Sequence, residues 1–540
     1  MSVLTAKDKS EAQFAKAVRL NQEGRPGRAL EICRKLVKKH PKHVATLHLA
    51  AISADGAGRG DLAITYFERA LAGGEDADIL TNLAITLARL GRQNEAAPPA
   101  RRAAELLPTS FEVFNNLGNI LRQSGDIDGA EDAYRRAIHL RPDAPDPQVN
   151  LAMLLEEVNR VEDSMTVLGA VPPSLAGDPR FAVFTARCER RLGRLDDAEL
   201  RLEELTLDHL PPVLAGIAAH ELGQIHDKRQ NWQTAYGWFE AANGYSRKAL
   251  PPHIRPETYP RLANDLLRFL ERPRDAKPTR PDPEDGPLPV LLAGFPRSGT
   301  TLLELILDGH PAINAAEEKP ILHGIRSWLA ENKGGYPSAL ATLDEKTLGK
   351  LRTRYWQTAE AFQPAARDGL FVDRNPLGTL DAILFNRLFP DAKIIFAVRH
   401  PADVCLSCFM QNFADNPAMA NFQTLQETVD LYVLTMTLWR NLQEKLAIDH
   451  IRVRYEDVVT DLETQIRRVI DFLDLDWHDG LLDHQATAKK RGRINTASYA
   501  EVAQPIYDTS RYRWKNYKVP LAPAMDRLQP FIQAFGYDET

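Results

Sequence analysis

The sequence has few cysteines and lacks long apolar runs. Its 540 residues contain four cysteines, Cys33, Cys188, Cys405 and Cys408. Their spacings do not form the framework of a small disulfide-bonded secreted domain, so we expect a reducing compartment. No stretch of 18 or more apolar residues occurs, and the N-terminus turns polar at once. We therefore expect a cytoplasmic protein without a secretory signal or a membrane span.

A large excess of either charge is also lacking. The net charge is -6, charged residues make up 26% of the chain and hydrophobic residues 44%. These values are ordinary for a globular protein and give no support for general nucleic-acid binding. The length exceeds what one hydrophobic core organises, so we expect two or more domains.

The first half of the sequence repeats with a period of about 34 residues. A turn residue recurs at each step, followed five positions later by a small residue such as Ala29 or Ala63. The turn residues are Gly24, Gly58, Gly91, Gly125, Asn159, Gly193 and Gln230. A tight turn followed by a small side chain favours two helices that approach closely.

This pattern resembles the tetratricopeptide repeat, and its best copy runs from Val113 to Pro142. The resemblance covers residues 11 to about 248 and implies six or seven helical hairpins in a right-handed solenoid. Concave solenoid surfaces commonly hold a peptide or a partner protein, although a structural or dimerising scaffold fits the pattern equally well. We assign residues 1–250 to this all-α repeat domain.

A change of composition follows the repeats. Residues 271–289 are dense in proline and charge, so we interpret residues 251–288 as a linker. Short apolar strands at Pro289–Ala293 and Ala392–Val398 and a helix at Thr300–Leu307 then predict an α/β domain with a parallel sheet. We assign residues 289–540 to it.

The strand at Pro289–Ala293 leads into a loop that lacks one lysine. Gly294-Phe295-Pro296-Arg297-Ser298-Gly299-Thr300-Thr301 has the glycine spacing of a phosphate-binding loop that opens a helix. A nucleoside-triphosphate-binding loop carries lysine where this chain has Thr300. The positive charge stands earlier, at Arg297, which argues for a different nucleotide.

The loop, followed by Asp308-Gly309-His310-Pro311, resembles the 5′-phosphosulfate-binding loop of sulfotransferases. The similarity is closest to the tyrosylprotein sulfotransferases and to bacterial-type proteins in which tetratricopeptide repeats precede a sulfotransferase domain. The resemblance implies 3′-phosphoadenosine 5′-phosphosulfate as co-substrate and no metal. The residues that it places on the nucleotide are Arg297, Ser298, Gly299, Thr300 and Thr301.

A second anion site is expected at the ribose end. Arg399 follows the strand Ala392–Val398, and Ser407 lies eight residues further, on the predicted next helix. An arginine at a strand end and a hydroxyl two helical turns on can share a phosphate group. The family places an arginine and a serine at this spacing on the 3′-phosphate.

Three further positions follow from the resemblance. Tyr455 matches a tyrosine near the nucleotide, although Tyr455-Glu456-Asp457 is also an ordinary strand exit into a helix. Ser498 matches a serine that contacts the transferring group. Arg513, with Lys515 next in preference, is our choice for a second contact to the 3′-phosphate within a basic and aromatic cluster.

Sulfuryl transfer requires a base for the acceptor hydroxyl and positive charge for the leaving phosphate. Glu318 lies 21 residues after Arg297, the spacing of the family's catalytic glutamate, so we predict it as the base. The alternative is that the charged stretch 317–320 merely starts a helix. His310 and His323 are second-choice bases, and His310 fits a helix terminus better.

The family's catalytic lysine is matched by Arg374, which retains the charge but does not act as a proton donor. Pro320 stands where an arginine of the tyrosylprotein type is expected, so the acceptor class stays open. The pair Cys405 and Cys408 lacks partner ligands and lies on one predicted helix face, which favours core packing over a metal or redox role.

We predict a sulfotransferase that uses 3′-phosphoadenosine 5′-phosphosulfate, with the repeats binding the acceptor or a partner. The acceptor hydroxyl belongs to a peptide tyrosine, a saccharide or a small molecule. Two alternatives stay open. One is a repeat scaffold with an inactive nucleotide-binding domain; the other is a P-loop nucleotide kinase.

Overall fold

The computed structural model describes residues 6–272, 286–332, 334–375, 377–446, 448–491 and 511–537. The chain divides into two compact units, residues 1–205 and 206–540. Among the described residues, none of the helices combines the length and the apolar character needed to cross a bilayer.

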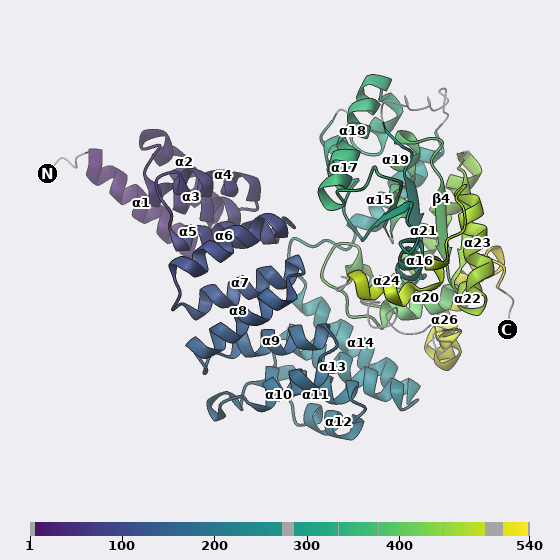
Figure 1. Ribbon diagram of the computed structural model, residues 1–540, viewed down its shortest axis with the longest axis horizontal. Helices are drawn as coiled ribbons and strands as arrows, with labels where there is room; N and C mark the ends of the chain where they lie inside the picture. The colour runs from purple at the N-terminus through teal and green to yellow at the C-terminus, as the bar shows by residue number, and fades with distance from the viewer. Residues whose placement is uncertain are drawn as a thin grey trace. The chain divides into compact units, whose positions relative to one another are not determined.

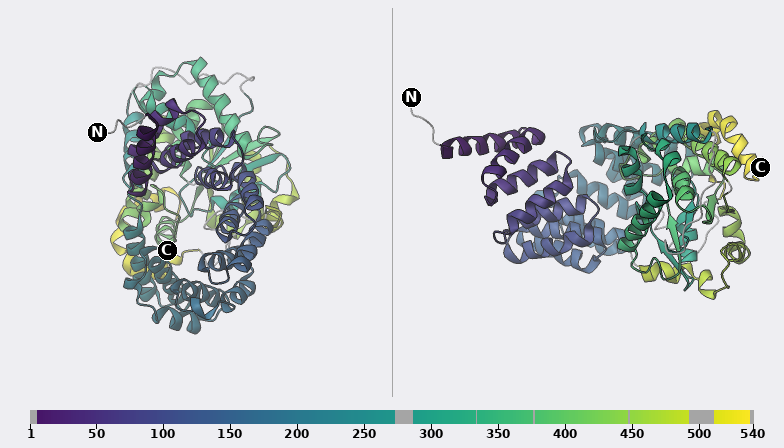
Figure 2. Two further views of the ribbon diagram at one scale, coloured as in Figure 1. Left: turned by 90° about the vertical axis from the view of Figure 1, so that its left-hand side faces the viewer. Right: turned by 90° about the horizontal axis from the view of Figure 1, so that it is seen from above.

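The first unit consists of helices in sequential antiparallel pairs. Each helix packs against the next one along the chain, and the pairs follow an arc that Figure 2 shows in purple to blue. The helices are α1 (Ala6–Gln22), α2 (Pro26–Lys39), α3 (Val44–Gly56), α4 (Gly60–Leu71), α5 (Ala77–Arg89), α6 (Gln93–Leu106), α7 (Phe111–Ser124), α8 (Ile127–Leu140), α9 (Pro145–Glu157), α10 (Val161–Gly169), α11 (Pro179–Arg191) and α12 (Leu195–Glu203).

The recurring turn predicted from the sequence is confirmed at every step. All seven turn residues have left-handed backbone, with φ between 63° at Asn159 and 86° at Gly125. Glycine adopts this conformation without steric cost, and asparagine tolerates it. The small residues five positions later, such as Ala29 and Ala63, are fully buried, and Ser164 is 1% exposed. Short side chains there let the paired helices approach closely.

The seventh hairpin, α13 (Pro212–Lys228) and α14 (Trp232–Ala249), belongs to the second unit, as does α15 (Thr258–Leu270). The boundary between the two compact units, at residues 205 and 206, therefore lies within the repeat pattern. The boundaries that we drew at residues 250 and 288 follow the sequence grammar and stay predictions, since residues 273–285 lie outside the described ranges.

The second unit contains a five-stranded parallel sheet, as expected for an α/β domain (Figure 1). The strand order is β2-β3-β1-β4-β5. The strands are β1 (Val290–Ala293), β2 (Ile313–Ala316), β3 (Leu370–Arg374), β4 (Ile394–Val398) and β5 (His450–Arg454). Register pairs Leu291 with Asp373 on one side and with Ile394 on the other. The sequence reasoning found β1, β4 and β5 but missed β2 and β3.

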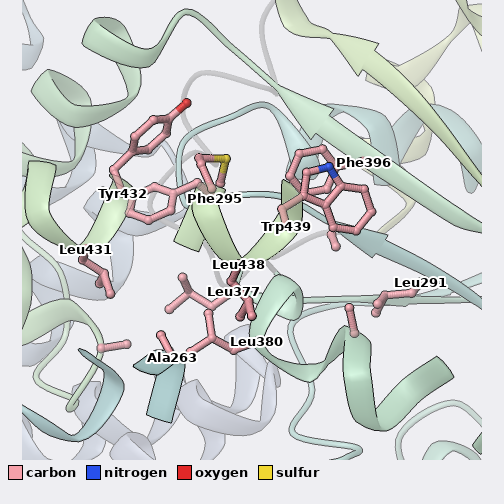
Figure 3. Packing of buried hydrophobic residues seen from close by; sticks show 14 of the residues in the cluster. Ala263, Leu291, Phe295, Leu377, Leu380, Phe396, Leu431, Tyr432, Leu438 and Trp439 are labelled. Atoms are coloured by element: carbon pink, nitrogen blue, oxygen red, sulfur yellow. The ribbon is translucent and has the colours of Figure 1, made fainter. Parts of the chain in front are cut away.

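Helices cover both faces of the sheet. Val290 and Leu292 pack with α16 (Thr300–Leu307) and α23 (Leu462–Phe472). Leu291 and Ala293 face the opposite side, where Figure 3 shows Leu291 with Leu377, Leu380 and stacked Phe396 and Trp439. The helices of that side are α17 (His323–Glu331), α18 (Glu345–Phe362), α19 (Gly378–Leu388), α20 (Pro401–Phe409), α21 (Leu425–Lys445) and α26 (Lys518–Ala534).

The strand order creates a switch point between β1 and β4. After β1 the chain continues to β2 and β3 on one side, and after β4 it continues to β5 on the other. The connections that follow β1 and β4 therefore run to opposite sides of the carboxyl end of the sheet. In open parallel sheets ligands bind at this position.

Candidate active site

The loop after β1 is held in a strained shape. Arg297 and Gly299 have left-handed backbone, with φ of 68° and 94°. A Cβ on Gly294 would lie 2.8 Å from the Ala397 carbonyl oxygen, so the loop and β4 approach closely only because residue 294 is glycine. Thr379 Oγ1 donates a hydrogen bond to the Gly294 carbonyl at 3.1 Å. Two contacts, with β4 and with α19, thus help define the path of the loop.

Ser298 closes the loop on itself. Its Oγ accepts a hydrogen bond from the Phe295 amide at 3.0 Å and donates one to the Phe295 carbonyl. The Phe295 ring packs edge-on against Tyr432, with centroids 5.1 Å apart (Figure 3). Ser298 shapes the loop through these contacts, and its predicted contact with the nucleotide stays a prediction.

The loop ends at the N-terminus of α16, which carries Thr300 and Thr301 on its first turn. Unpaired amides and the positive end of the helix dipole favour an anion there. Thr300 is 3% exposed and Thr301 6% exposed, so their hydroxyls lie in a largely water-excluded place. The predicted residues 297–301 are therefore brought together in an arrangement suited to a phosphate.

The two predicted anion sites are in direct contact. Arg297 Nε donates a hydrogen bond to Ser407 Oγ at 3.0 Å, and Arg399 Nη1 donates one to the Arg297 carbonyl at 3.4 Å. Arg399 directly follows β4, and Ser407 lies on α20. The residues predicted for the 5′ end and for the 3′ end thus meet at the switch point between β1 and β4.

Arg399 is 8% exposed and lies over the Tyr455 ring, with its Cζ 5.0 Å from the ring centroid. Tyr455 begins α22 (Tyr455–Thr460) directly after β5 and contacts the loop, since a Cβ on Gly299 would lie 2.8 Å from Tyr455 Cδ2. The carboxylate of Asp403 lies 4.0 Å from Arg399 Nη2. Tyr455 therefore lies against both predicted anion sites.

The C-terminal segment 511–517 reaches the same place. The Trp514 ring stacks on His400 with centroids 5.0 Å apart and an interplanar angle of 9°, and the Trp514 amide donates to Asp403 Oδ1 at 2.8 Å. Burial, and then the positive charges of Lys515 and Arg399, lower the pKa of His400 to about 4, so the imidazole is neutral. His400 Nδ1 and Trp514 Nε1 are buried without hydrogen-bond partners among the described residues.

Arg513 has a partner from the seventh repeat hairpin. Its Nη2 lies 2.5 Å from Asp227 Oδ2, and Tyr517 donates a hydrogen bond to Asp227 Oδ1 at 2.6 Å. Lys515 Nζ lies 5.1 Å from the centroid of the Tyr512 ring. The contact of Arg513 with a 3′-phosphate stays a prediction, and the ion pair anchors the segment that carries Trp514.

Glu318 and Arg374 form an ion pair. Arg374 Nη1 donates to Glu318 Oε1 at 2.8 Å and to Thr301 Oγ1 at 3.1 Å. Arg374 is fully buried at the end of β3, whereas the Glu318 side chain is 41% exposed. Glu318 follows β2 and precedes α17, which begins at His323, so the alternative that residues 317–320 start a helix is wrong. The predicted base and the predicted charge-stabilising residue thus lie together beside the loop.

The sequence reasoning missed Glu304. This residue lies on α16, is 1% exposed, and its Oε2 pairs with Arg374 Nε. The signal was a single carboxylate in the otherwise apolar stretch 302–307. Arg374 therefore lies between two carboxylates, one buried and one open to solvent.

A cleft of about 320 Å³ adjoins Glu318. Its walls include Lys319, His323, Asp373 and residues 416–419. Burial raises the pKa of Asp373 to about 7, and the nearby charge of Asp381 adds to this, while the hydrogen bond from Tyr355 at 3.0 Å opposes it. The cleft thus combines donors and acceptors that suit a hydroxyl-bearing molecule.

The two second-choice bases differ in position. His310 donates from Nε2 to the Asp476 carbonyl at 2.9 Å and accepts from the Ala312 amide at Nδ1, so both ring nitrogens serve the backbone at the end of α16. His323 lines the cleft, and desolvation followed by the charge of Arg326 lowers its pKa. His323 stays the second-choice base.

Ser498 lies outside the described residues, so its predicted role is untested. Cys405 and Cys408 are fully buried in the core, as predicted from their spacing. Within the described part of the chain, no group of three or more histidine, cysteine or acidic side chains is arranged to hold a metal ion.

Comparisons with known protein families agree with both halves of the fold. Residues 289–479 match the sulfotransferase family, and residues 48–111 and 121–188 match tetratricopeptide repeats. A tetratricopeptide repeat protein of Parabacteroides merdae ATCC 43184 superposes with a TM-score of 0.38 at 17% identity, over 44% of this chain and 93% of that one.

Several relatives are similar in sequence. An uncharacterised protein of Aquifex aeolicus (strain VF5) is 23% identical over 446 residues, which are 81% of this chain and 52% of that protein. The chain thus spans about half the length of this relative. Protein-tyrosine sulfotransferase A of Caenorhabditis elegans is 24% identical over 266 residues, 46% of this chain and 67% of that protein. Protein-tyrosine sulfotransferase 1 of Homo sapiens is 24% identical over 275 residues, 47% and 70% respectively.

Proposed function

From a chain that carries a sulfotransferase-family domain after tetratricopeptide repeats, we propose an enzyme that transfers the sulfuryl group of 3′-phosphoadenosine 5′-phosphosulfate to an acceptor hydroxyl. The observation that carries this proposal is the contact of Arg297 with Ser407 beside the Glu318–Arg374 pair. Two predicted anion-binding sites, which contain Arg297 and Arg399, and the exposed carboxylate of Glu318 thus lie at the same end of the sheet.

In this proposal the nucleotide lies across the carboxyl ends of β1 and β4. Residues 297–301 and the N-terminus of α16 bind the 5′-phosphosulfate, because amides and hydroxyls converge there. Arg399 and Ser407 bind the 3′-phosphate, and the hydrogen bond from Arg297 to Ser407 brings this group next to the loop after β1. Tyr455 and Trp514 supply aromatic surfaces for the adenosine.

Transfer then proceeds in one displacement. The acceptor oxygen forms a bond to sulfur as the bond between sulfur and the phosphate oxygen breaks, and the acceptor proton passes to Glu318. Arg297 and the α16 N-terminus stabilise the charge that develops on the leaving phosphate. Arg374 stabilises the sulfuryl oxygens by charge and hydrogen bonding only, since a guanidinium does not release its proton at neutral pH.

The cleft beside Glu318 receives the acceptor. Its polar walls fit a hydroxyl on a peptide tyrosine, a saccharide or a small molecule. Since two of the relatives are named protein-tyrosine sulfotransferases, tyrosine peptides are the first acceptors to test. In this proposal the repeats bind the acceptor or a partner protein.

The test is transfer of radiolabelled sulfate from the nucleotide to a panel of tyrosine peptides, saccharides and phenols. Wild type is expected to label at least one class, and Glu318→Gln to lose at least about 100-fold in rate, the usual scale for a general base. Glu317→Gln is the matched control, because the neighbouring Glu317 lies 3.9 Å from Lys319 rather than on Arg374.

Binding experiments separate the outcomes. Glu318→Gln is expected to bind adenosine 3′,5′-bisphosphate as wild type does, while Arg297→Ala abolishes binding. Tight bisphosphate binding by a wild type that labels no acceptor class would contradict the proposed activity and favour an inactive scaffold. Binding of ATP with Mg²⁺ in preference to the bisphosphate would favour a P-loop kinase.

A further inference from the structure

Glu304 is a buried carboxylate in an apolar helix. It is 1% exposed, and its helical neighbours Leu302, Leu303 and Leu305 are all buried. An ionised carboxylate in such surroundings requires a charged partner, because burial without one costs several kcal/mol. One such partner is Arg374, whose Nε pairs with Glu304 Oε2.

Arg374 presents different edges to its two carboxylates. Glu304 takes the Nε edge, whereas Nη1 bridges Glu318 Oε1 at 2.8 Å and Thr301 Oγ1 at 3.1 Å. Among the described residues Nη2 and Nε are both buried without a hydrogen-bond partner, so the contact of Nε with Glu304 is an ion pair and not a hydrogen bond. The pair with Glu304 thus leaves one edge of the guanidinium for the reacting groups.

We propose that Glu304 is a positioning residue that neutralises Arg374 and sets the proton affinity of Glu318. This inference rests on the proposed function of Glu318 as base. With Glu304 ionised, the three side chains carry one net negative charge, so Glu318 is not the sole counter-ion of Arg374 and keeps its capacity to take a proton. Without Glu304, the full charge of Arg374 would hold Glu318 in its ionised form.

The pair also accounts for arginine at this position. A planar guanidinium offers separate donors to Glu304 and Glu318, whereas a lysine ammonium is a single point charge on a flexible stem. Two carboxylates on opposite edges therefore need an arginine between them. Arg374 thus explains why a carboxylate is buried at position 304, and Glu304 explains why position 374 is an arginine.

The test is Glu304→Gln, which retains the volume of the side chain and removes the charge. Calorimetry in buffers of different ionisation enthalpy measures the protons taken up when adenosine 3′,5′-bisphosphate binds. Protons that wild type takes up and Glu318→Gln does not are assigned to Glu318. In Glu304→Gln this uptake is expected at a pH lower by about one unit, with affinity within about twofold of wild type.

The pH dependence of kcat/KM for a labelled acceptor gives a second readout. Its acid limb is expected to move to lower pH by about one unit in Glu304→Gln, with kcat reduced by roughly 10-fold because a weaker base accepts the proton less readily. A merely structural role would lower the rate without moving this limb.

A double variant covers the case in which Glu304→Gln misfolds, because it leaves no buried unpaired charge. Glu304→Gln with Arg374→Gln removes the distant carboxylate and also the cation in contact with Glu318, so proton uptake is expected at a higher pH than in wild type. Glu360→Gln, which alters an exposed pair with Arg367, is the control.

Three results would overturn the proposal: unchanged proton uptake in Glu304→Gln, an upward shift, or equal uptake in wild type and Glu318→Gln. None of them depends on finding an acceptor. Failure of the proposed function would appear instead as absence of sulfate transfer by wild type.

Discussion

Arg297 and Ser407 are hydrogen-bonded at 3.0 Å although 110 positions separate them in the chain. One belongs to the loop after β1 and the other to the helix after β4. In our proposal these residues bind opposite ends of one nucleotide. The hydrogen bond between them brings the two predicted phosphate-binding groups next to each other.

Ser407→Ala is expected to weaken binding of adenosine 3′,5′-bisphosphate by roughly 10-fold, because a hydrogen bond to a charged group contributes about 1.5–3 kcal/mol and part of this is offset by the freed Arg297. Binding of adenosine 5′-monophosphate, which lacks the 3′-phosphate, should change by less than about twofold. Isothermal titration calorimetry with both nucleotides measures this difference. Equal losses for the two would contradict a 3′-phosphate role, and exposed Ser327→Ala serves as control.

Gly299→Ala is expected to lower nucleotide affinity by at least about 10-fold and to reduce the melting temperature. Left-handed backbone costs a residue with a side chain about 1–2 kcal/mol, and the added methyl group would lie 2.8 Å from Tyr455 Cδ2. Thermal melts with and without bisphosphate measure both effects. Gly244→Ala, on helix α14 in open space, should leave affinity unchanged. Wild-type affinity in Gly299→Ala would show that the loop conformation is not required for binding.

Asp227→Asn is expected to weaken bisphosphate binding by roughly 3- to 10-fold. Asp227 holds Arg513 and Tyr517, and the same segment carries Trp514, which stacks on His400 beside Arg399. Loss of this anchor should increase the mobility of the segment, so binding must pay more ordering entropy. Fluorescence anisotropy with a labelled nucleotide measures the change. Asp208→Asn, which alters an exposed contact with Tyr245, is the control, and equal effects of both variants would refute a specific anchor.

Asp373→Asn is expected to raise the free energy of unfolding above that of wild type, and by more at pH 8 than at pH 4.5. The pKa of Asp373 rises from an ordinary value of 3.8 to about 7 in the folded state, so the folded protein holds this proton more tightly than the unfolded chain. Stability from this group is complete below about pH 4, falls as pH rises, and is lost above about pH 7. Asparagine removes this dependence.

The gain in Asp373→Asn should therefore grow between pH 4.5 and pH 8, by roughly 1–4 kcal/mol. Melting temperatures of variant and wild type at several pH values measure it. The exposed carboxylate variant Asp368→Asn should show no such growth. A difference between Asp373→Asn and wild type that is constant with pH would contradict the buried-acid interpretation.

The sequence by itself determined the repeating hairpins. Each left-handed turn favours glycine and each close helix contact favours alanine, and both residues recur about every 34 positions. The sequence likewise determined the phosphate loop and the strand–helix units around Arg399, where a strand, a turn and a helix start are contiguous in the chain. Strands β2 and β3 escaped it. Strand β3 ends in Asp373 and Arg374, which no pattern of alternating polarity predicts.

Only the tertiary structure decided which charges meet. The family resemblance pointed to Glu318 and to Arg374 separately. Their ion pair, the bond from Arg297 to Ser407 and the ion pair of Arg513 with Asp227 each join elements distant in sequence. Glu304 shows the reason most directly. A carboxylate among leucines looks like an anomaly on its own helix, and its function follows once strand pairing places Arg374 beside it, because buried charges are compensated across the fold and not along the chain.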